Sequence, residues 1–299
     1  LKNILKHWVF ERADGMSDED IRLRKYVKAL VCGREHEWQT ADIRCFPTDS
    51  TYVSLPDGRR MNLSLAEEKL LLMNDLLLLQ LLSDTTINRP LYVTTSMDLN
   101  EISYIKPHLS LEGLLYKVVP ACGEDNSIHV NTDVMFDNVM NKFKFGGLES
   151  CGIYADYDVS KMLYAHQQKM AMLVDALMRE GDMERALSVV RKWQSDYPQE
   201  YIMYDKTLLV FAECLYLAGS TEEADEIAER LLVHSAEWLE WCNGKTNKRR
   251  NASGYTEYVW IKTMNQSLTL VQEHTRTHLL DIYIPLYKSY LTSYEQFFK

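Results

Sequence analysis

Two pairs of side chains in this sequence have spacings that suit chemistry. His274 and His278 are four residues apart, so they share one helix face and would suit two ligands of a metal ion. A third ligand is not evident nearby, and two histidines at a helix end are the ordinary interpretation. Asp156 and Asp158 point the same way on an extended strand, where they would suit acid–base chemistry or a cation. The alternative for this pair is a turn at the start of a helix.

The motifs of the common enzyme classes are missing. The sequence has no P-loop, no GxGxxG after a strand, no HExxH and no GxSxG. The six cysteines include no CxxC pair and are too sparse for a small disulfide scaffold. Cys214 lies on an apolar helix face, which predicts a buried thiol. We therefore expect no catalytic residues, no metal and no cofactor in this chain.

Polar and aromatic side chains are densest between residues 131 and 158. Amide, carboxylate and aromatic groups together suit a sugar or a peptide, because hydroxyl groups need directed hydrogen bonds and apolar ring faces need stacking partners. We predict a pocket between two subdomains, lined by Asn138, Lys142, Tyr154 and Asp156. The alternative is a linker, in which Phe143 and Phe145 fix the subdomains together.

The charge of the chain argues against nucleic acid as a partner. The formal net charge is −10 and the pI is about 5.4, whereas a nucleic-acid-binding domain is usually basic. One compact basic cluster stands out, within the polar residues 243–254: Lys245, Lys248, Arg249 and Arg250. A solvated loop is the ordinary interpretation of this cluster, and a phosphate-binding patch is the alternative.

No apolar run reaches the ~20 residues that a membrane-spanning helix needs. The richest stretch, residues 65–82, is interrupted by charged and amide side chains, so it predicts a buried helix. The chain begins at Leu1 and lacks a signal segment. We expect an excised fragment, with any targeting or membrane segment upstream.

The pattern of apolar residues predicts an α+β fold that is predominantly helical, with a small α/β unit first. Short strands are expected at residues 43–46, 52–55, 88–95 and 114–119, and a turn at 56–58. Helices are expected at 21–30, 64–82 and 99–111, the second opened by a capping box of Ser64 and Glu67. This alternation is the βαβ pattern of a partly parallel sheet.

A helical repeat follows. From Tyr164 onward the apolar residues have a helical period, which is broken by Gly181 and by Gly219. Ala186 and Ala224, which follow the two breaks, are 38 residues apart. The arrangement resembles tetratricopeptide hairpins, in which a small residue opens the second helix against the first. The sequence departs from that pattern at Trp193, where the consensus has a small residue.

The elements after the first hairpin complete the predicted organisation. Ser220 and Glu223 have the spacing of a capping box at the start of the last repeat helix. The tail carries a stripe of aromatic residues at helical spacing (Tyr283, Tyr287, Tyr290, Tyr294 and Phe298), which predicts core packing that closes the repeat array, with a kink or restart at Pro285. We predict three parts: an α/β domain at 1–125, a connecting segment at 126–160 and the repeat domain at 161–299.

Three segments resemble a known protein family. Residues 88–93 (NRPLYV), 112–120 (EGLLYKVVP) and 130–146 (VNTDVMFDNVMNKFKFG) match its motifs in order and at similar spacing, with residues 154–156 just beyond. The family is the bacterial domain of unknown function 2723 family, whose members are polytopic membrane proteins similar to the transmembrane protein O-mannosyltransferases of the GT-C class. Phe136 and Gly147 depart from the family pattern.

The resemblance implies an accessory role. In GT-C enzymes the acidic catalytic motif belongs to the membrane region, so this chain would be a non-catalytic, periplasmic domain of a protein in the bacterial inner membrane. Its partners would be the upstream membrane region and a peptide or glycan acceptor. Two alternatives stay open: a free-standing tetratricopeptide-like scaffold that binds a protein partner, and an enzyme with an unrecognised site.

Overall fold

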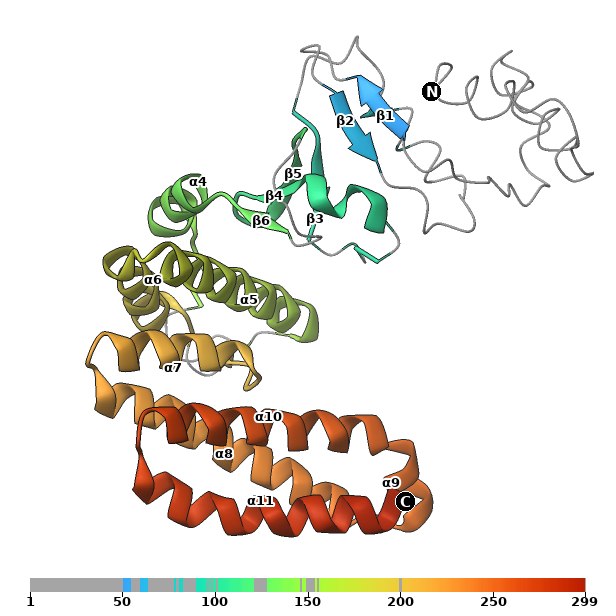
Figure 1. Cartoon of the computed structure of the whole chain (residues 1–299), viewed down its shortest axis with the longest axis vertical. Coiled ribbons are helices and arrows are strands. Elements are labelled where there is room, and N and C mark those ends of the chain that lie inside the picture. Colours follow the sequence, from blue (N-terminus) through green and yellow to red (C-terminus); the bar gives the residue numbers. More distant parts are fainter. Residues whose placement is uncertain are drawn as a thin grey trace, which may run out of the picture. The chain divides into compact units, whose positions relative to one another are not determined.

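The computed structural model describes residues 51–54, 60–63, 78, 81–82, 90–95, 97, 99–100, 102–120, 128–145, 147–148, 154, 156–198 and 201–298. The chain divides into two compact units, Leu1–Asn131 and Thr132–Lys299, here called the N-terminal and C-terminal units (Figure 1). The three-part division at residues 125 and 160 stays a prediction. The fold class is confirmed: the protein is α+β and predominantly helical.

The N-terminal unit contains two small sheets. Strands β1 (Thr51–Ser54) and β2 (Arg60–Leu63) form an antiparallel pair, with Thr51 opposite Leu63. The second sheet has the order β3-β5-β4-β6. Its strands are β3 (Tyr92–Thr94), β4 (Leu109–Leu111), β5 (Leu115–Val118) and β6 (His129–Val130).

The second sheet is partly parallel, as predicted, but the predicted βαβ order is wrong. Strand β5 is antiparallel to both β3 and β4, and the parallel pair is β4 with β6. Residues 99–111, predicted as one crossover helix, instead form a short 3-10 helix at Ser103–His108 and then strand β4. A three-residue turn around Gly113 (φ 150°) joins β4 to β5, and so short a connection permits only an antiparallel pair.

Apolar side chains from these elements form the core of the unit. Met61 and Leu63 of β2 are buried, as are Ile105, Leu109 and Tyr116. The His108 ring nitrogen Nε2 lies 2.6 Å from the carbonyl oxygen of Asn62, which links the 3-10 helix to β2. The predicted helix at 21–30, strand at 43–46, turn at 56–58 and capping box at 64–67 lie outside the described residues, and of the predicted helix 64–82 only residues near its end are described, as helical.

The described residues of the C-terminal unit form helices and their connections without a strand, as predicted from residue 160 onward (Figure 1). It begins with α4 (Thr132–Asp137), which continues as a π-helical turn at Asn138–Lys142. Seven further helices follow: α5 (Tyr157–Glu180), α6 (Met183–Asp196), α7 (Thr207–Leu217), α8 (Thr221–Asn243), α9 (Asn247–Ala252), α10 (Gly254–Glu273) and α11 (Thr277–Phe298).

The two predicted hairpins are α5 with α6 and α7 with α8. Gly181 and Gly219 adopt the left-handed backbone conformation (φ 81° and 80°), which turns the chain sharply between the paired helices. The Asp182 carboxylate accepts a hydrogen bond from the Arg185 amide at 3.1 Å and so caps α6. Ala186 and Ala224 are fully buried at the start of the second helix of each hairpin, where a small side chain permits close packing.

The capping box predicted at the start of α8 is wrong. Ser220 makes no side-chain capping hydrogen bond. Its hydroxyl instead accepts a hydrogen bond from Arg191 Nη2 at 3.0 Å, and the Glu223 carboxylate pairs with the same guanidinium. Arg191 competes for both side chains, so they tie α6 to α8 rather than closing the end of α8.

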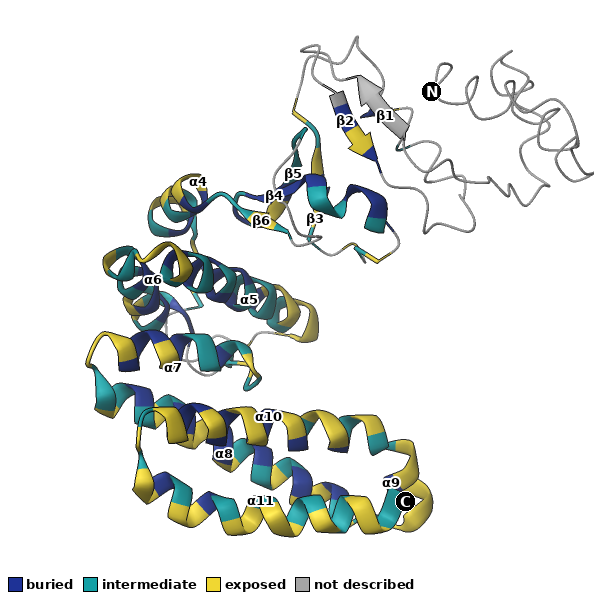
Figure 2. Cartoon of the chain, in the orientation of Figure 1, coloured by how far each residue is buried: buried dark blue, intermediate teal, exposed yellow. Residues whose placement is uncertain are grey.

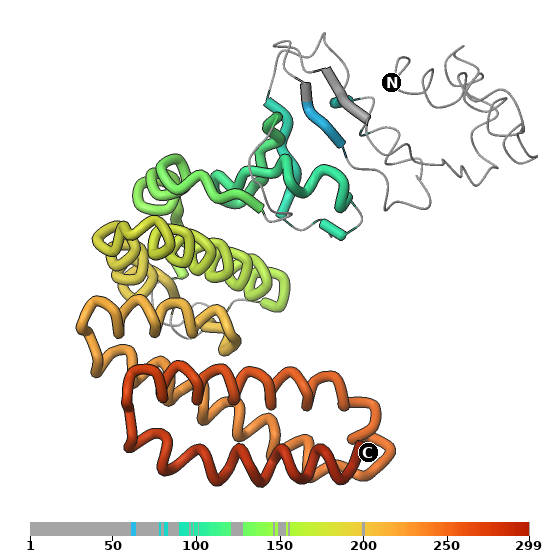
Figure 3. The backbone as a smooth tube through the Cα atoms, viewed as in Figure 1, coloured from blue at the N-terminus to red at the C-terminus, as the bar shows by residue number. Residues whose placement is uncertain are grey.

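Helix α8 of the second hairpin also lies side by side with the last two long helices, α10 and α11 (Figure 3). Their shared core includes Leu232, Leu239, Met264 and Val271. The tail tyrosines pack against this core as predicted. Tyr283 lies inside the core, and Tyr287, Tyr290 and Tyr294 are half-buried beside it. Helix α11 runs through Pro285 without a restart. Residues 243–254, predicted as a solvated loop, contain the short helix α9.

Candidate functional site

The structure brings together two of the four predicted binding residues. Lys142 Nζ donates a hydrogen bond to Asn138 Oδ1 at 2.7 Å and lies 2.8 Å from the carboxylate of Asp137. Lys142 is the largest cause of the lowered pKa of Asp137. These side chains occupy neighbouring turns of one exposed helical segment, which places an amide, an ammonium group and a carboxylate beside one another.

The other two predicted binding residues precede α5. Tyr154 is 86% exposed, and Asp156 is exposed as well. Asp156 Oδ1 accepts a hydrogen bond from the Val159 amide at 2.9 Å and thereby caps α5. The extended-strand interpretation of Asp156 and Asp158 is wrong, because α5 begins at Tyr157 and Asp158 lies in its first turn. Whether the four residues bind a ligand stays a prediction.

Aromatic contacts attach the segment before α5 to the first hairpin. The ring centroids of Phe143 and Phe145 lie 5.2 and 5.7 Å from that of His166 on α5. Phe145 is buried and also lies 5.5 Å from the Tyr197 ring. These rings therefore hold residues 143–145 against the first hairpin within the C-terminal unit, and whether they also fix the two subdomains together stays a prediction.

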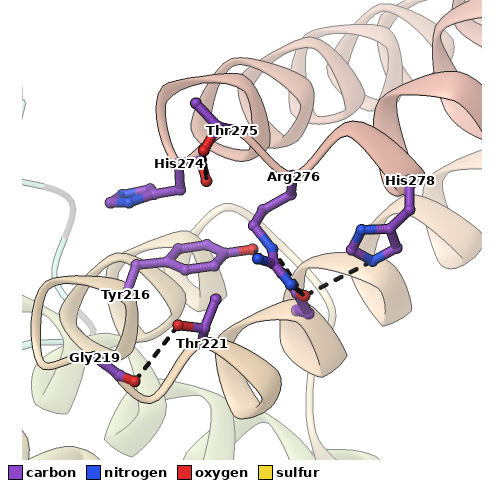
Figure 4. Close-up of polar contacts among 8 residues, drawn as sticks. Tyr216, Gly219, Thr221, His274, Thr275, Arg276 and His278 are labelled. Carbon is purple, nitrogen blue, oxygen red and sulfur yellow. Dashed lines mark hydrogen bonds and ion pairs between the residues drawn. The ribbon is translucent and has the colours of Figure 1, made fainter.

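The two spaced histidines contact different partners (Figure 4). The His274 ring stacks on Tyr216, with centroids 4.3 Å apart, whereas His278 Nε2 lies 3.7 Å from Asp225 Oδ2. Throughout the described ranges of the chain, no group of three or more His, Cys, Asp or Glu side chains is placed to hold a metal ion. The histidines thus belong to a polar contact between helix turns.

Asp225 is the centre of that contact. Arg276 Nε donates to both of its carboxylate oxygens at 2.9 Å, and the Tyr216 hydroxyl donates to Oδ1 at 2.7 Å. Burial alone would raise the pKa of Asp225, but Arg276 and Tyr216 together lower it, so the carboxylate stays ionised. The cluster fastens the turn between α7 and α8 to the turn between α10 and α11, as Figure 4 shows.

A pocket of about 300 Å³ lies between the two hairpins. It is formed by α6, by residues 202–204 and by helices α7 and α8. Its lining combines aromatic, aliphatic and charged side chains: Trp193, Gln194, Ile202, Tyr204, Leu208, Glu223, Glu226, Ile227 and Arg230. The volume is at the lower end of the range for small-molecule sites.

Charged groups give this pocket its chemistry. Trp193 is 3% exposed and its indole N–H is buried, so this ring contributes apolar surface to the lining rather than an accessible donor. Glu223 accepts a hydrogen bond from Gln194 at 2.9 Å, and its pairing with Arg191 is the largest cause of its lowered pKa. Glu226 lies 4.0 Å from Arg230. The pocket lining therefore combines two carboxylates and a guanidinium with aromatic and aliphatic side chains.

A row of aromatic rings, here called the aromatic stripe, continues from the pocket wall. Its members are Tyr204, His234, Trp238, Trp241 and Trp260. The ring centroid of His234 lies 5.0 Å from that of Tyr204 and 5.2 Å from that of Trp260. Trp238 stacks on Trp260 at 5.8 Å and meets Trp241 edge-on at 5.1 Å. No residue of the stripe is buried, so its rings retain exposed surface.

His234 is neutral in this stripe. Burial lowers its pKa below the ordinary value of 6.5, although Glu237 acts in the opposite direction. Trp238 Nε1 donates to His234 Nε2 at 3.0 Å, so in the neutral ring the proton is on Nδ1. A neutral imidazole with a fixed tautomer continues the row of rings without adding charge.

Sequence reasoning missed the pocket and the stripe. Two signals were present: Trp193 stands where the repeat pattern has a small residue, and residues 234, 238 and 241 share one helix face. The contribution of Tyr204 has no comparable local signal, because it depends on how the connection between α6 and α7 folds onto α8.

Comparison with known proteins relates one part of the chain to proteins connected with membrane glycosyltransferases. Residues 48–136 match the family described as TMEM260-associated domain 2. The match is consistent with a TMEM260-like, O-mannosyltransferase-related domain and suggests a membrane glycosyltransferase-related protein. No curated protein and no solved structure matches the chain. The finer assignment to the domain of unknown function 2723 family stays a prediction.

The matched segment contains both small sheets and most of α4. The pocket and the aromatic stripe lie in later residues. In the portion of the chain that the structure describes, no helix combines the length and the apolar character needed to cross a membrane.

Proposed function

We propose that this chain is a non-catalytic, extracytoplasmic part of a polytopic membrane protein related to glycosyltransferases, with the membrane region in the bacterial inner membrane and this part in the periplasm. The observation that carries the proposal is the match of residues 48–136 to TMEM260-associated domain 2. The resemblance of residues 88–93, 112–120 and 130–146 to membrane O-mannosyltransferase-like proteins supports it. In such a protein the catalytic motif belongs to the membrane region, so this chain assists the transfer.

The assistance that the geometry supports best is binding of the acceptor at the pocket and the aromatic stripe. Exposed tryptophan and tyrosine faces stack on the apolar faces of sugar rings or on peptide side chains. Glu223 and Glu226 line the pocket, where their carboxylates accept hydrogen bonds from hydroxyl or amide groups of a ligand. These groups fit a glycosylated or hydroxyl-rich peptide.

The test is a binding titration of the whole chain, measured by isothermal titration calorimetry. The probes are a synthetic Ser/Thr-rich peptide and the same peptide with one O-linked mannose. Glu226→Gln removes a carboxylate of the pocket lining, and Tyr204→Ala removes the ring shared by the pocket and the stripe. We expect each to weaken binding roughly ten-fold, the equivalent of one lost hydrogen bond or stacking contact.

Tyr157→Ala is the matched control, because Tyr157 is 71% exposed on α5 and lies outside the pocket and the stripe. It should bind both probes as the unmodified chain does. If neither probe binds, or if Tyr157→Ala weakens binding as much as Tyr204→Ala, acceptor binding at this site is refuted.

A second candidate function is a free-standing scaffold for a protein partner, favoured by the two repeat hairpins α5–α6 and α7–α8. The two functions differ in how the protein is held in the cell. Alkaline extraction of native membranes should leave the proposed membrane protein in the pellet, detected with an antibody to this chain. Release of the chain into the supernatant would favour the scaffold.

A further inference from the structure

One end of the bundle of α8, α10 and α11 combines basic and aromatic side chains. Helix α9 connects α8 to α10 at this end, and the C-terminus of α11 lies beside it (Figures 1 and 3). Figure 2 shows that much of the surface here is exposed. We call this region the basic end and define it by six residues: Trp241, Lys245, Lys248, Arg249, Tyr255 and Tyr258.

The charge of the basic end is opposite to that of the chain. Residues 241–256 contain four basic and no acidic residues, although the whole chain has a net charge of −10. Lys248 and Arg249 are exposed on α9. The next acidic residue along the chain, Glu257, is 1% exposed and paired with Arg250, so it does not cancel the exposed cations. Glu240 precedes the segment on α8, and Glu295 lies on α11, so the positive surface is confined to α9 and its flanking turns.

Buried contacts hold α9 in place and fix which side chains face the solvent. Arg250 donates to the two carboxylate oxygens of Glu257 at 3.1 and 2.5 Å and to Ser293 Oγ of α11 at 3.1 Å. Its guanidinium also lies 4.6 Å from the Phe297 ring centroid. Since Arg250 points inward, the two residues before it on the same short helix project outward.

Aromatic side chains surround these cations at the same end. Tyr255, Tyr258 and Trp241 are 81%, 49% and 54% exposed, although large apolar rings gain free energy when they leave water. Lys245 Nζ lies 3.2 Å from the centroid of the Trp241 ring and donates to Ser253 Oγ at 2.6 Å. The ring and the ammonium group are therefore presented together.

We propose that the basic end binds the surface of a bilayer that contains anionic lipids. Lysine and arginine pair with lipid phosphates, while tyrosine and tryptophan rings settle at the level of the headgroups, where an apolar ring body and a polar edge are both accommodated. An acidic polypeptide would satisfy the cations but would leave exposed tyrosines without an apolar phase. The proposal concerns α9 and its neighbours and does not depend on acceptor binding at the pocket.

The test is sedimentation of the whole chain with vesicles of phosphatidylcholine alone or with one third phosphatidylglycerol. We expect binding to the anionic vesicles and little to the neutral ones, with weaker binding at high ionic strength because salt screens exposed charges. The double substitution Lys248→Gln and Arg249→Gln should reduce the partition coefficient roughly 25-fold, since each cation near an anionic surface contributes about five-fold. Tyr255→Ser with Tyr258→Ser should reduce it further.

Lys144→Gln with Lys206→Gln is the matched control, because both lysines are exposed elsewhere on the C-terminal unit and the net charge changes equally. It should leave vesicle binding unchanged. The proposal is overturned if neutral and anionic vesicles bind alike or if the control loses as much binding as the α9 variant. Polyglutamate added as a competitor gives a third readout. Full competition by it, together with no effect of the tyrosine substitutions, would instead identify an acidic polypeptide as the partner.

Discussion

Substitution of Asp225 by asparagine should destabilise the C-terminal unit, because one carboxylate joins two distant helix turns. Asp225 accepts from Arg276 Nε with both oxygens at 2.9 Å and from the Tyr216 hydroxyl at 2.7 Å. Its side chain is 14% exposed and that of Arg276 is 30% exposed. Asparagine keeps the shape and an oxygen for Tyr216 but removes the charge opposite the guanidinium.

The expected loss of unfolding free energy is about 2 kcal/mol. Removing one partner of a fully buried ion pair costs about 3–5 kcal/mol, and the partial exposure of Arg276 lets water replace part of the interaction. The matched control is Asp175→Asn. That substitution breaks an exposed pair with Arg179 at 2.8 Å and should cost about 0.5 kcal/mol or less.

The assay is urea unfolding of the whole chain. Tryptophan fluorescence reports the transition, because four tryptophans lie in α6, α8 and α10. The double substitution with Arg276→Gln should cost less than the sum of the two single losses, since they remove the same contact. If Asp225→Asn unfolds at the same urea concentration as Asp175→Asn, the proposed coupling of the turns is absent.

The effect of Asp225 should also depend on pH. The folded-state pKa of Asp225 lies below its ordinary value, so its contribution is fully present above the unfolded pKa of about 3.9 and is lost as the pH falls through the folded value. The difference in stability between the unmodified chain and Asp225→Asn should therefore stay constant near neutral pH and shrink below about pH 4. A difference that grows on acidification would refute this assignment.

Three further predictions concern the hairpin contacts, a buried thiol and the proposed non-catalytic role. Ala186→Leu and Ala224→Leu should each lower the unfolding free energy by ~1–3 kcal/mol, because both alanines are fully buried and a larger side chain overpacks the contact; unchanged urea midpoints would contradict this. Burial raises the pKa of the Cys214 thiol to about 11, so iodoacetamide at pH 8 should alkylate Cys214 only after unfolding, as peptide mass spectrometry would show. The purified chain should transfer no sugar from a nucleotide or polyprenyl donor; turnover that is lost on Asp156→Ala would refute a non-catalytic role.

The helical hairpins were predictable because their signals are local. A glycine at 181 or 219 supplies the left-handed turn, and the alanine five residues later marks the close contact, so neither inference needs a distant part of the chain. The sheet was less predictable. Strand direction there depends on the three-residue turn at Gly113, and an apolar run such as 99–111 suits either a helix or a short helix followed by a strand.

The candidate site was less accessible to sequence reasoning because it depends on competition and on long-range contacts. Ser220 and Glu223 have the spacing of a capping box, yet Arg191 takes both side chains. Arg250 belongs to a basic run that predicted a solvated loop, yet a buried pair with Glu257 orders α9. In each case an arginine and a carboxylate from two different helices form a charge-assisted contact that is stronger than the local backbone alternative.

The departures from the repeat pattern are what create the pocket. Trp193 replaces a small residue, and its ring packs on Phe211 at 4.6 Å, which keeps the facing helices from closing on each other there. The repeat is also 38 residues long instead of about 34, and the longer connection between α6 and α7 contributes Ile202 and Tyr204 to the pocket wall. A consensus repeat would bury these positions in helix packing. Here they leave a cavity lined by aromatic, aliphatic and charged side chains, so the least regular part of the repeat is where ligand binding should be tested first.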